Sequence, residues 1–227
     1  EVGAVCRRRK VLFLLDAAQT AGLVPVDMAA LQADMVAFTG HKSLLGPTGT
    51  GGLVVGPGVE VASTVWGGTG VRSAWREHPV DFPWRLEAGT LNTVGIVGLE
   101  AALDWLEEQE SGAVFARECR LADAFLAGCA ALDGVTVHGF GESSPTLLGP
   151  DHLPVIPITV RGRTPEEIGL FLDTDWDIAV RTGLHCAPAA HQALGTAPDG
   201  SVRFSFGPFT TEQDVETALS ALSGLSS

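Results

Sequence analysis

Two short apolar runs, each ending abruptly in polar residues, constrain the fold more than any other feature of the sequence. Residues 11–15 are all apolar and stop at Asp16, and residues 35–38 form a second run that stops at Thr39. Uninterrupted apolar runs of this length are typical of central parallel strands that are buried on both faces. We therefore predict an α/β fold in which polar side chains collect at the carboxyl ends of two strands.

The pattern of predicted elements changes about halfway along the chain. The other strands are predicted at residues 52–55, 135–137, 155–158, 178–180 and 202–206. The helices are predicted at residues 96–106 and 113–132, from the capping box Thr164-Pro165-Glu166-Glu167, and from about Thr211. Residues 57–92 are rich in Gly, Pro and Trp and are predicted to form loops. We predict part of a mostly parallel-sheet large domain at residues 1–107 and a smaller α+β domain at 108–227.

Charge and composition exclude several classes of function. The formal net charge is −13, which argues against nucleic acid as a partner, because phosphate backbones are bound through Lys and Arg. The four cysteines form no CxxC pair and have no metal-ligand spacing, so neither a disulfide framework nor a metal site is predicted. No apolar stretch approaches the roughly 20 residues of a membrane span. We expect a soluble, cytoplasmic, enzyme-like protein.

A carboxylate and an amine follow the two apolar runs. Alone, Asp16 suits a helix cap and Lys42 a solvated surface position. Together, at one edge of a sheet, they match the needs of pyridoxal phosphate: an amine forms the imine, and a carboxylate keeps the pyridine nitrogen protonated. Gln19 is then a candidate donor to the ring oxygen, and Thr39 and His41 are candidates for the phosphate.

Five motifs, in order, extend this pattern through the chain. They are residues 16–19 (DAAQ), 39–42 (TGHK), 87–90 (EAGT), 181–188 (RTGLHCAP) and 202–205 (VRFS). In this set the sequence resembles the cysteine desulfurases of the class V aminotransferase group, which are fold type I enzymes dependent on pyridoxal phosphate. The resemblance covers essentially the whole chain, which corresponds to the later part of a family member.

The resemblance implies a cofactor site. Lys42 is then the Schiff-base lysine, Asp16 pairs with the pyridine nitrogen, and Gln19 contacts the ring oxygen. Thr39 and His41 bind phosphate or surround the lysine. In the family, the segment matching Thr90 reaches the phosphate in the neighbouring subunit, which implies a homodimer.

The resemblance also implies the substrate and the reaction. Arg203 corresponds to the arginine that binds the substrate carboxylate, Arg181 lines the site, and Cys186 receives sulfur as a persulfide while L-cysteine becomes L-alanine. Cations from Arg181, His185 or Arg203 are expected to favour the thiolate. A sulfur-acceptor protein and a role in sulfur metabolism, such as iron-sulfur cluster assembly, follow from the same resemblance.

Two other functions remain open from the sequence. One is another class V enzyme, either a selenocysteine lyase or a transaminase, in which Cys186 is not catalytic. The other is a truncated, cofactor-free scaffold paralogue, because family members carry an earlier segment with further phosphate contacts and an imidazole that stacks on the ring. For a polypeptide that begins at Glu1 we expect weak cofactor binding, little turnover and no strong internal-aldimine absorbance band.

Overall fold

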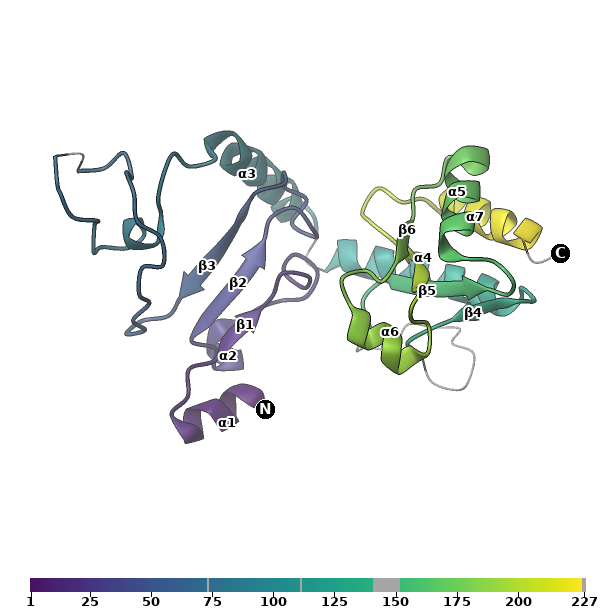
Figure 1. The fold of residues 1–227 in the computed structure, drawn as a ribbon, viewed down its shortest axis with the longest axis horizontal. Helices are drawn as coiled ribbons and strands as arrows, with labels where there is room; N and C mark the ends of the chain where they lie inside the picture. Colours follow the sequence, from purple (N-terminus) through teal and green to yellow (C-terminus); the bar gives the residue numbers. More distant parts are fainter. Residues whose placement is uncertain (73, 111, 141–151, 226–227) are drawn as a thin grey trace. The chain divides into compact units, whose positions relative to one another are not determined.

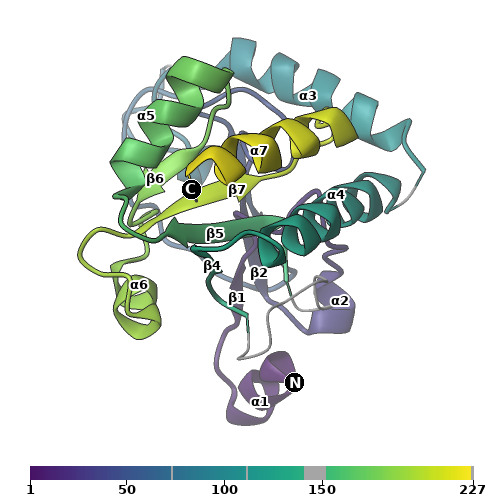
Figure 2. The same cartoon turned by 90° about the vertical axis from the view of Figure 1, so that its right-hand side faces the viewer.

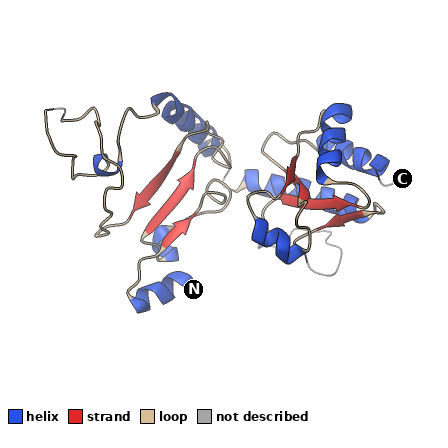
Figure 3. Cartoon of the chain, in the orientation of Figure 1, coloured by secondary structure: helices blue, strands red, loops and turns tan. Residues whose placement is uncertain are grey.

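The structure is a computed structural model that describes residues 1–72, 74–110, 112–140 and 152–225. The chain divides into two compact units, Glu1–Gly112 and Ala113–Ser227, each built from strands and helices (Figures 1 and 3). The domain boundary predicted after residue 107 lies at the end of a helix, Thr93–Glu107, and the first unit continues from there to Gly112. None of the helices in the described ranges has the length and apolar character of a membrane span.

The first unit is built around a three-stranded sheet with the order β1-β2-β3. Its elements are α1 (Val2–Arg9), β1 (Leu14–Asp16), α2 (Met28–Leu31), β2 (Met35–Thr39), β3 (Gly51–Val55), the 3-10 helix η1 (Trp84–Leu86) and α3 (Thr93–Glu107). Between residues 57 and 92, η1 is the one helix or strand that the described residues contain, in agreement with the loops predicted there.

The predicted mostly parallel sheet is wrong for these strands. β1 and β2 are parallel, with Asp16 opposite Ala37, but β2 and β3 are antiparallel, with Thr39 opposite Gly51. A parallel connection needs a crossover of about a dozen residues or more, usually through a helix. Residues 40–50 instead form a tight loop that returns the chain directly beside β2. The prediction missed that this loop makes a hairpin-like return.

β1 is also shorter and less buried than its apolar sequence indicates. It spans three residues at an edge of the described sheet, and Leu14 is 46% exposed. Burial in this unit is concentrated at Val36 in β2 and at Ala17, which follows β1. The expectation of a strand buried on both faces therefore fails for β1 in this chain.

The second unit contains a four-stranded antiparallel sheet with the order β4-β5-β7-β6. Its elements are α4 (Ala113–Ala130), β4 (Val135–Val137), β5 (Val155–Val160), α5 (Pro165–Trp176), β6 (Arg181–Gly183), α6 (Pro188–Leu194), β7 (Ser201–Ser205) and α7 (Glu212–Leu225). Figure 2 shows α4, α5 and α7 lying side by side over one face of this sheet. The core lies between those helices and the strands.

Alternating side chains of the strands supply much of this core. Ile156 and Ile158 of β5 are fully buried, and Phe204 of β7 lies with its ring centroid 4.6 Å from that of Phe125 in α4. Each fully buried apolar side chain of this size stabilises the fold by about 1.5–3 kcal/mol. The opposite face of β7 carries Arg203, as the alternation predicts.

The start of α5 confirms the predicted capping box. The Thr164 hydroxyl accepts a hydrogen bond from the Glu167 N–H, and the Glu167 carboxylate accepts one from the Thr164 N–H at 2.8 Å. These two bonds satisfy N–H groups that the first helical turn leaves without partners. The strand predicted at 178–180 is three residues too early, because Ile178 N–H donates to the Leu172 carbonyl and completes the exit from α5.

A buried carboxyl group in α4 makes the stability of this unit depend on pH. Glu118 is 3% exposed, and burial raises its pKa from 4.5 to about 7. The folded protein therefore keeps this proton up to about pH 7, whereas the unfolded chain loses it near 4.5. The contribution of Glu118 to the free energy of unfolding is therefore fully present below pH 4.5 and is lost as the pH rises to about 7.

We predict that Glu118→Gln stabilises the protein at pH 8 by about 1–2 kcal/mol, allowing for partial hydration of the carboxyl group, with a smaller gain at pH 4.5. Denaturant unfolding at both pH values measures the difference. Glu216→Gln, at an exposed position in α7, is the matched control and should show no such pH dependence. Equal effects of Glu118→Gln at both pH values would contradict the prediction.

Candidate active site

The first group of candidate residues lies at one edge of the β1-β2-β3 sheet. Asp16 is the last residue of β1, and its Oδ1 accepts a hydrogen bond from the Ala18 N–H at 2.9 Å. Thr39 is the last residue of β2. Because β1 and β2 are parallel, their carboxyl ends lie at the same edge. Asp16 and the segment from Thr39 to Lys42 therefore start from neighbouring strand ends.

The loop that carries Lys42 is closed by its own backbone. The Gly40 N–H donates to the Thr50 carbonyl at 2.9 Å, and the Gly46 N–H donates to the Gly40 carbonyl at 2.7 Å. A Cβ atom on Gly40 would collide with the Thr50 side chain, so glycine is required for this close approach. The Lys42 carbonyl accepts from the Leu45 N–H, and the Lys42 side chain is exposed.

Two side chains next to the lysine are joined to each other. Thr39 Oγ1 and His41 Nδ1 share a hydrogen bond of 2.9 Å, and Thr39 Oγ1 also lies 3.5 Å from the Thr50 carbonyl oxygen. The threonine thus fixes the direction of the imidazole. A hydroxyl group and an imidazole that flank an exposed amine are suited to holding an anionic group there.

The turn after β1 packs against the lysine loop. The Ser43 hydroxyl donates to the Gln19 carbonyl at 3.5 Å, and a Cβ atom on Gly22 would lie 2.5 Å from the Ser43 carbonyl oxygen. Gly22 has a φ of 95°, which glycine adopts readily. Residues 16–22 and the lysine loop therefore form one assembly in which Asp16, Gln19 and Lys42 come from adjoining segments.

The side chains of the first group have the chemistry that pyridoxal phosphate needs. Asp16 would hold the pyridine nitrogen, Gln19 the ring oxygen, Lys42 the reactive carbon, and Thr39 with His41 the phosphate or the surroundings of the lysine. A carboxylate and an amine from adjoining segments at one sheet edge are the two groups that this cofactor requires most.

Thr90 lies elsewhere in the first unit. It is exposed and follows Gly89, whose N–H donates to the Gly68 carbonyl at 2.7 Å. Two residues later, the Asn92 side chain caps α3 and lies 3.5 Å from the Gly49 carbonyl oxygen. The segment that carries Thr90 is thus tied to the end of the lysine loop, while Thr90 itself remains exposed.

The second group of candidate residues lies on β6 and β7 of the second unit. Arg181 of β6 is directly opposite Arg203 of β7 in the antiparallel ladder. Like charges at directly opposite positions destabilise a sheet. Burial, and then the charge of Arg181, lowers the pKa of Arg203, whereas Cys186 acts in the opposite direction. Such a pair of cations is suited to an anionic ligand.

Cys186 follows β6 and is exposed. The Arg181 Nη2 donates a hydrogen bond to its Sγ at 3.4 Å. The Arg203 Nε is buried and has no hydrogen-bond partner within the described part of the chain. An exposed thiol and two guanidinium groups, one of them with an unpaired Nε, therefore lie at one end of the sheet.

The structure corrects the expected role of His185 as a cation. Burial, followed by the charges of Arg203 and His191, lowers the pKa of His185 from its ordinary value of 6.5. At neutral pH the ring is therefore uncharged, and the positive charge beside Cys186 comes from the arginines. His185 Nε2 and Ser201 Oγ lie 3.1 Å apart, a contact across 16 positions that the sequence pattern did not reveal.

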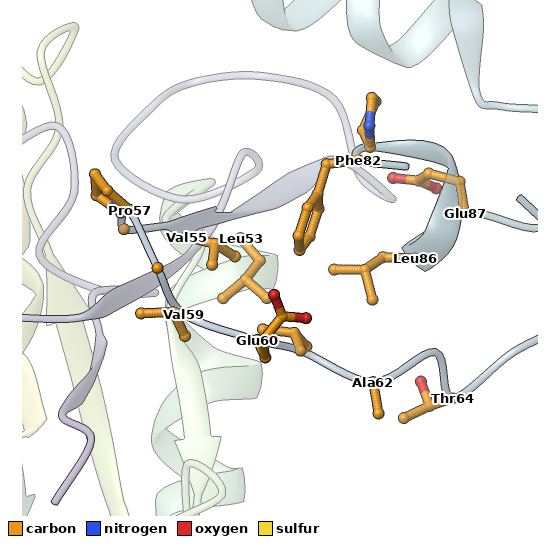
Figure 4. A pocket seen from close by; sticks show the side chains of 14 residues that line it. Leu53, Val55, Pro57, Val59, Glu60, Ala62, Thr64, Phe82, Leu86 and Glu87 are labelled. Carbon is orange, nitrogen blue, oxygen red and sulfur yellow. The ribbon is translucent and has the colours of Figure 1, made fainter. Parts of the chain in front are cut away.

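A separate hollow in the first unit contains none of these residues. It has a volume of about 780 Å³ and is lined by β3, the following segment and the region around η1. Figure 4 shows Phe82 and Leu86 on one side of the hollow and Leu53 and Val55 on the other. Its main polar feature is a pair of carboxylates, Glu60 and Glu87. Neither a free amine nor a thiol lines it, so it is a poor candidate for the proposed chemistry.

Comparisons with known proteins identify the family of the chain. The sequence profile described as aminotransferase class-V matches residues 1–218. The chain therefore belongs to the class V aminotransferase family. This family depends on pyridoxal phosphate.

The similar proteins include a probable cysteine desulfurase of Methanothermobacter thermautotrophicus, 31% identical over 95% of this chain and 53% of that protein. The cysteine desulfurase CsdA of Escherichia coli is 33% identical over 93% of this chain and 50% of its own length. The apo structure of the cysteine desulfurase from Thermococcus onnurineus superposes with a TM-score of 0.80 at 30% identity, covering 99% of this chain and 55% of that one. The chain spans about half the length of the curated relatives it matches.

The arginine pair predicts charge-selective reactivity of the neighbouring thiol. We expect Arg203→Gln to slow alkylation of Cys186 by anionic iodoacetate about fivefold relative to neutral iodoacetamide, because one of two nearby positive charges is lost. Peptide mass spectrometry measures both rates at Cys186, and Cys6 in α1 is an internal reference. An unchanged ratio at Cys186 would show that Arg203 does not act on anions at this thiol.

Proposed function

We propose that this chain supplies the cofactor lysine and the sulfur-accepting cysteine of a pyridoxal phosphate-dependent cysteine desulfurase. The observation that carries the proposal is the exposed thiol of Cys186, whose Sγ lies 3.4 Å from Arg181 Nη2. Arg203 is directly opposite Arg181 on the neighbouring strand. L-Cysteine carries both a carboxylate, which guanidinium groups bind, and a sulfur atom, which a thiolate attacks. This arrangement suits that substrate better than it suits an amino acid without sulfur.

The residues of the first unit are assigned to activation of the amino acid. When bound, pyridoxal phosphate supplies an electron sink that allows the α-proton of the substrate to leave. Asp16 holds the proton on the ring nitrogen, and Lys42 anchors the cofactor and then carries the α-proton on Nζ. Thr39 and His41 hold the anionic end of the cofactor or the surroundings of the lysine.

The residues of the second unit are assigned to sulfur removal. Arg203 binds the substrate carboxylate, and Arg181 supports the thiolate form of Cys186. The thiolate attacks the substrate sulfur, so that a sulfur–sulfur bond forms and the carbon–sulfur bond breaks. The electron pair of the broken bond passes to the carbon skeleton, which takes up protons and leaves as L-alanine. The products are alanine and a persulfide on Cys186, and no external oxidant or reductant is required.

We predict that Cys186→Ala lowers alanine and sulfide formation from L-cysteine by about 100-fold or more, because the nucleophile is lost. The assay uses the protein produced from its full coding sequence, with pyridoxal phosphate and a thiol acceptor. Cys119→Ala, at a half-buried position in α4, is the control and should retain activity.

Other outcomes of this assay identify the other candidate functions. Alanine and sulfide formation that survives Cys186→Ala would contradict the persulfide mechanism and favour another class V reaction, such as selenocysteine lysis. Transamination by both proteins would favour a transaminase. Absence of any turnover and of cofactor absorbance in the unaltered protein would favour a scaffold.

The same proposal includes a homodimer that passes sulfur to an acceptor protein. Large apolar side chains of the first unit are strongly exposed, among them Trp66 at 70%, Trp75 at 57% and Val94 at 84%. Aromatic side chains are enriched at interfaces, so these residues are candidates for one. We expect light scattering to give the mass of two chains, and Val94→Glu to shift this toward one chain. Leu170→Glu in α5, 65% exposed in the other unit, should leave the dimer intact. A monomeric unaltered protein would contradict the proposal.

A further inference from the structure

The loop that carries Cys186 holds two consecutive residues in the left-handed backbone region. The φ angles are 51° at His185 and 61° at Cys186. For a residue with a Cβ atom this region is strained relative to the right-handed region, because the Cβ atom lies too close to the following carbonyl oxygen. Two such residues in sequence persist only where surrounding contacts fix the backbone. A specific anchor for the loop is therefore expected.

A hydrogen bond between His185 and Ser201 joins this loop to β7. Ser201 is the first residue of β7, is fully buried and lies opposite Gly183 at the end of β6. A buried hydroxyl group needs a partner, and His185 Nε2 at 3.1 Å supplies it. Next to Ser201, a Cβ atom on Gly200 would collide with the Gly183 carbonyl, so the two chain segments approach closely at this point.

A second histidine lies close to the His185 ring. His191 of α6 is buried, shares a 2.7 Å hydrogen bond with Thr196 Oγ1, and has its ring centroid 5.4 Å from that of His185. Burial, followed by the charge of Arg203, lowers the pKa of His185, so its ring is neutral at neutral pH. The imidazole therefore has one neighbour at the start of β7, Ser201, and another in α6, His191.

We propose that the His185–Ser201 hydrogen bond is a positioning contact that fixes the left-handed backbone at Cys186 and so holds the Cys186 sulfur beside Arg181. His185 and Cys186 are adjacent in sequence, so the imidazole acts on the thiol through the backbone. The role of Cys186 as sulfur acceptor rests on the proposed function, but its position beside the arginines is measured without turnover. The two ideas can therefore fail separately.

The test compares alkylation of Cys186 by iodoacetate and iodoacetamide in the full protein, with each rate followed by peptide mass spectrometry. His185→Ala and Ser201→Ala each remove one side of the hydrogen bond. His185→Gln keeps a nitrogen or oxygen near the position of Nε2 and is the conservative rescue variant. His138→Ala is the matched control, because His138 Nε2 shares a similar 2.9 Å bond with Thr159 Oγ1 of β5 and not with the Cys186 loop.

We expect His185→Ala and Ser201→Ala to lower the iodoacetate-to-iodoacetamide rate ratio at Cys186 about fivefold, as the sulfur leaves the arginines. His185→Gln and His138→Ala should stay within about twofold of the unaltered protein. Buried Cys129, 1% exposed in the core of the same unit, should remain unreactive in every variant and so reports that the fold is intact.

Three results would overturn the proposal. The first is an unchanged ratio in both His185→Ala and Ser201→Ala. The second is a loss in His185→Gln as large as in His185→Ala, which would show that ring packing and not the hydrogen bond matters. The third is reactive Cys129 in both alanine variants, which would make the pair part of the core rather than a positioning contact.

Discussion

The antiparallel register between β6 and β7 is the constraint on which the chemistry of the second unit depends. It places Arg181 opposite Arg203 and Gly183 opposite Ser201. β7 is held in this register by β5, through the pairs Ile156 with Phe204 and Ile158 with Val202, all of which are buried. A slip of one residue would turn Arg203 into the core and Phe204 to the outside, at a large cost in apolar burial.

Because this register is fixed by the core, the unfavourable arginine pair can be maintained. The repulsion between two cations at directly opposite strand positions is offset by packing elsewhere in the sheet. Proteins maintain local strain at functional sites in the same way, because the surrounding structure stabilises it. The left-handed residues at His185 and Cys186 are a second cost at the same place. Both features are reasonable if an anionic ligand and a reactive thiol have to meet there.

In the first unit, glycines allow the segments that carry the candidate residues to approach closely. Parallel pairing of β1 with β2 brings Asp16 and the end of β2 to one edge, and Gly22 and Gly40 allow the turn after β1, the lysine loop and Thr50 to approach closely. Side chains at these two glycines would push the segments apart. The position of Lys42 relative to Asp16 therefore depends on backbone contacts that no side-chain pattern shows.

The sequence predicted what local patterns determine. Capping at Thr164, the alternation around Arg203 and the helices α3, α4 and α7 follow from propensity and periodicity, and the structure has them. The antiparallel return of β3 was missed, because the apolar run that gives a strand says nothing of its direction. The start of β6 was missed because Ile178 and Val180 pack against the core after α5 instead of pairing. The bond from His185 to Ser201 and the neutral state of His185 depend on burial and on neighbours distant in sequence.

Mass spectrometry of the protein after incubation with pyridoxal phosphate and L-cysteine tests the central claim most directly. The account predicts one added sulfur atom on the peptide that contains Cys186, removable by a reducing thiol, and none on the peptides of Cys6, Cys119 or Cys129. Alanine formation without any added sulfur on Cys186, or with the sulfur on another cysteine, would contradict it.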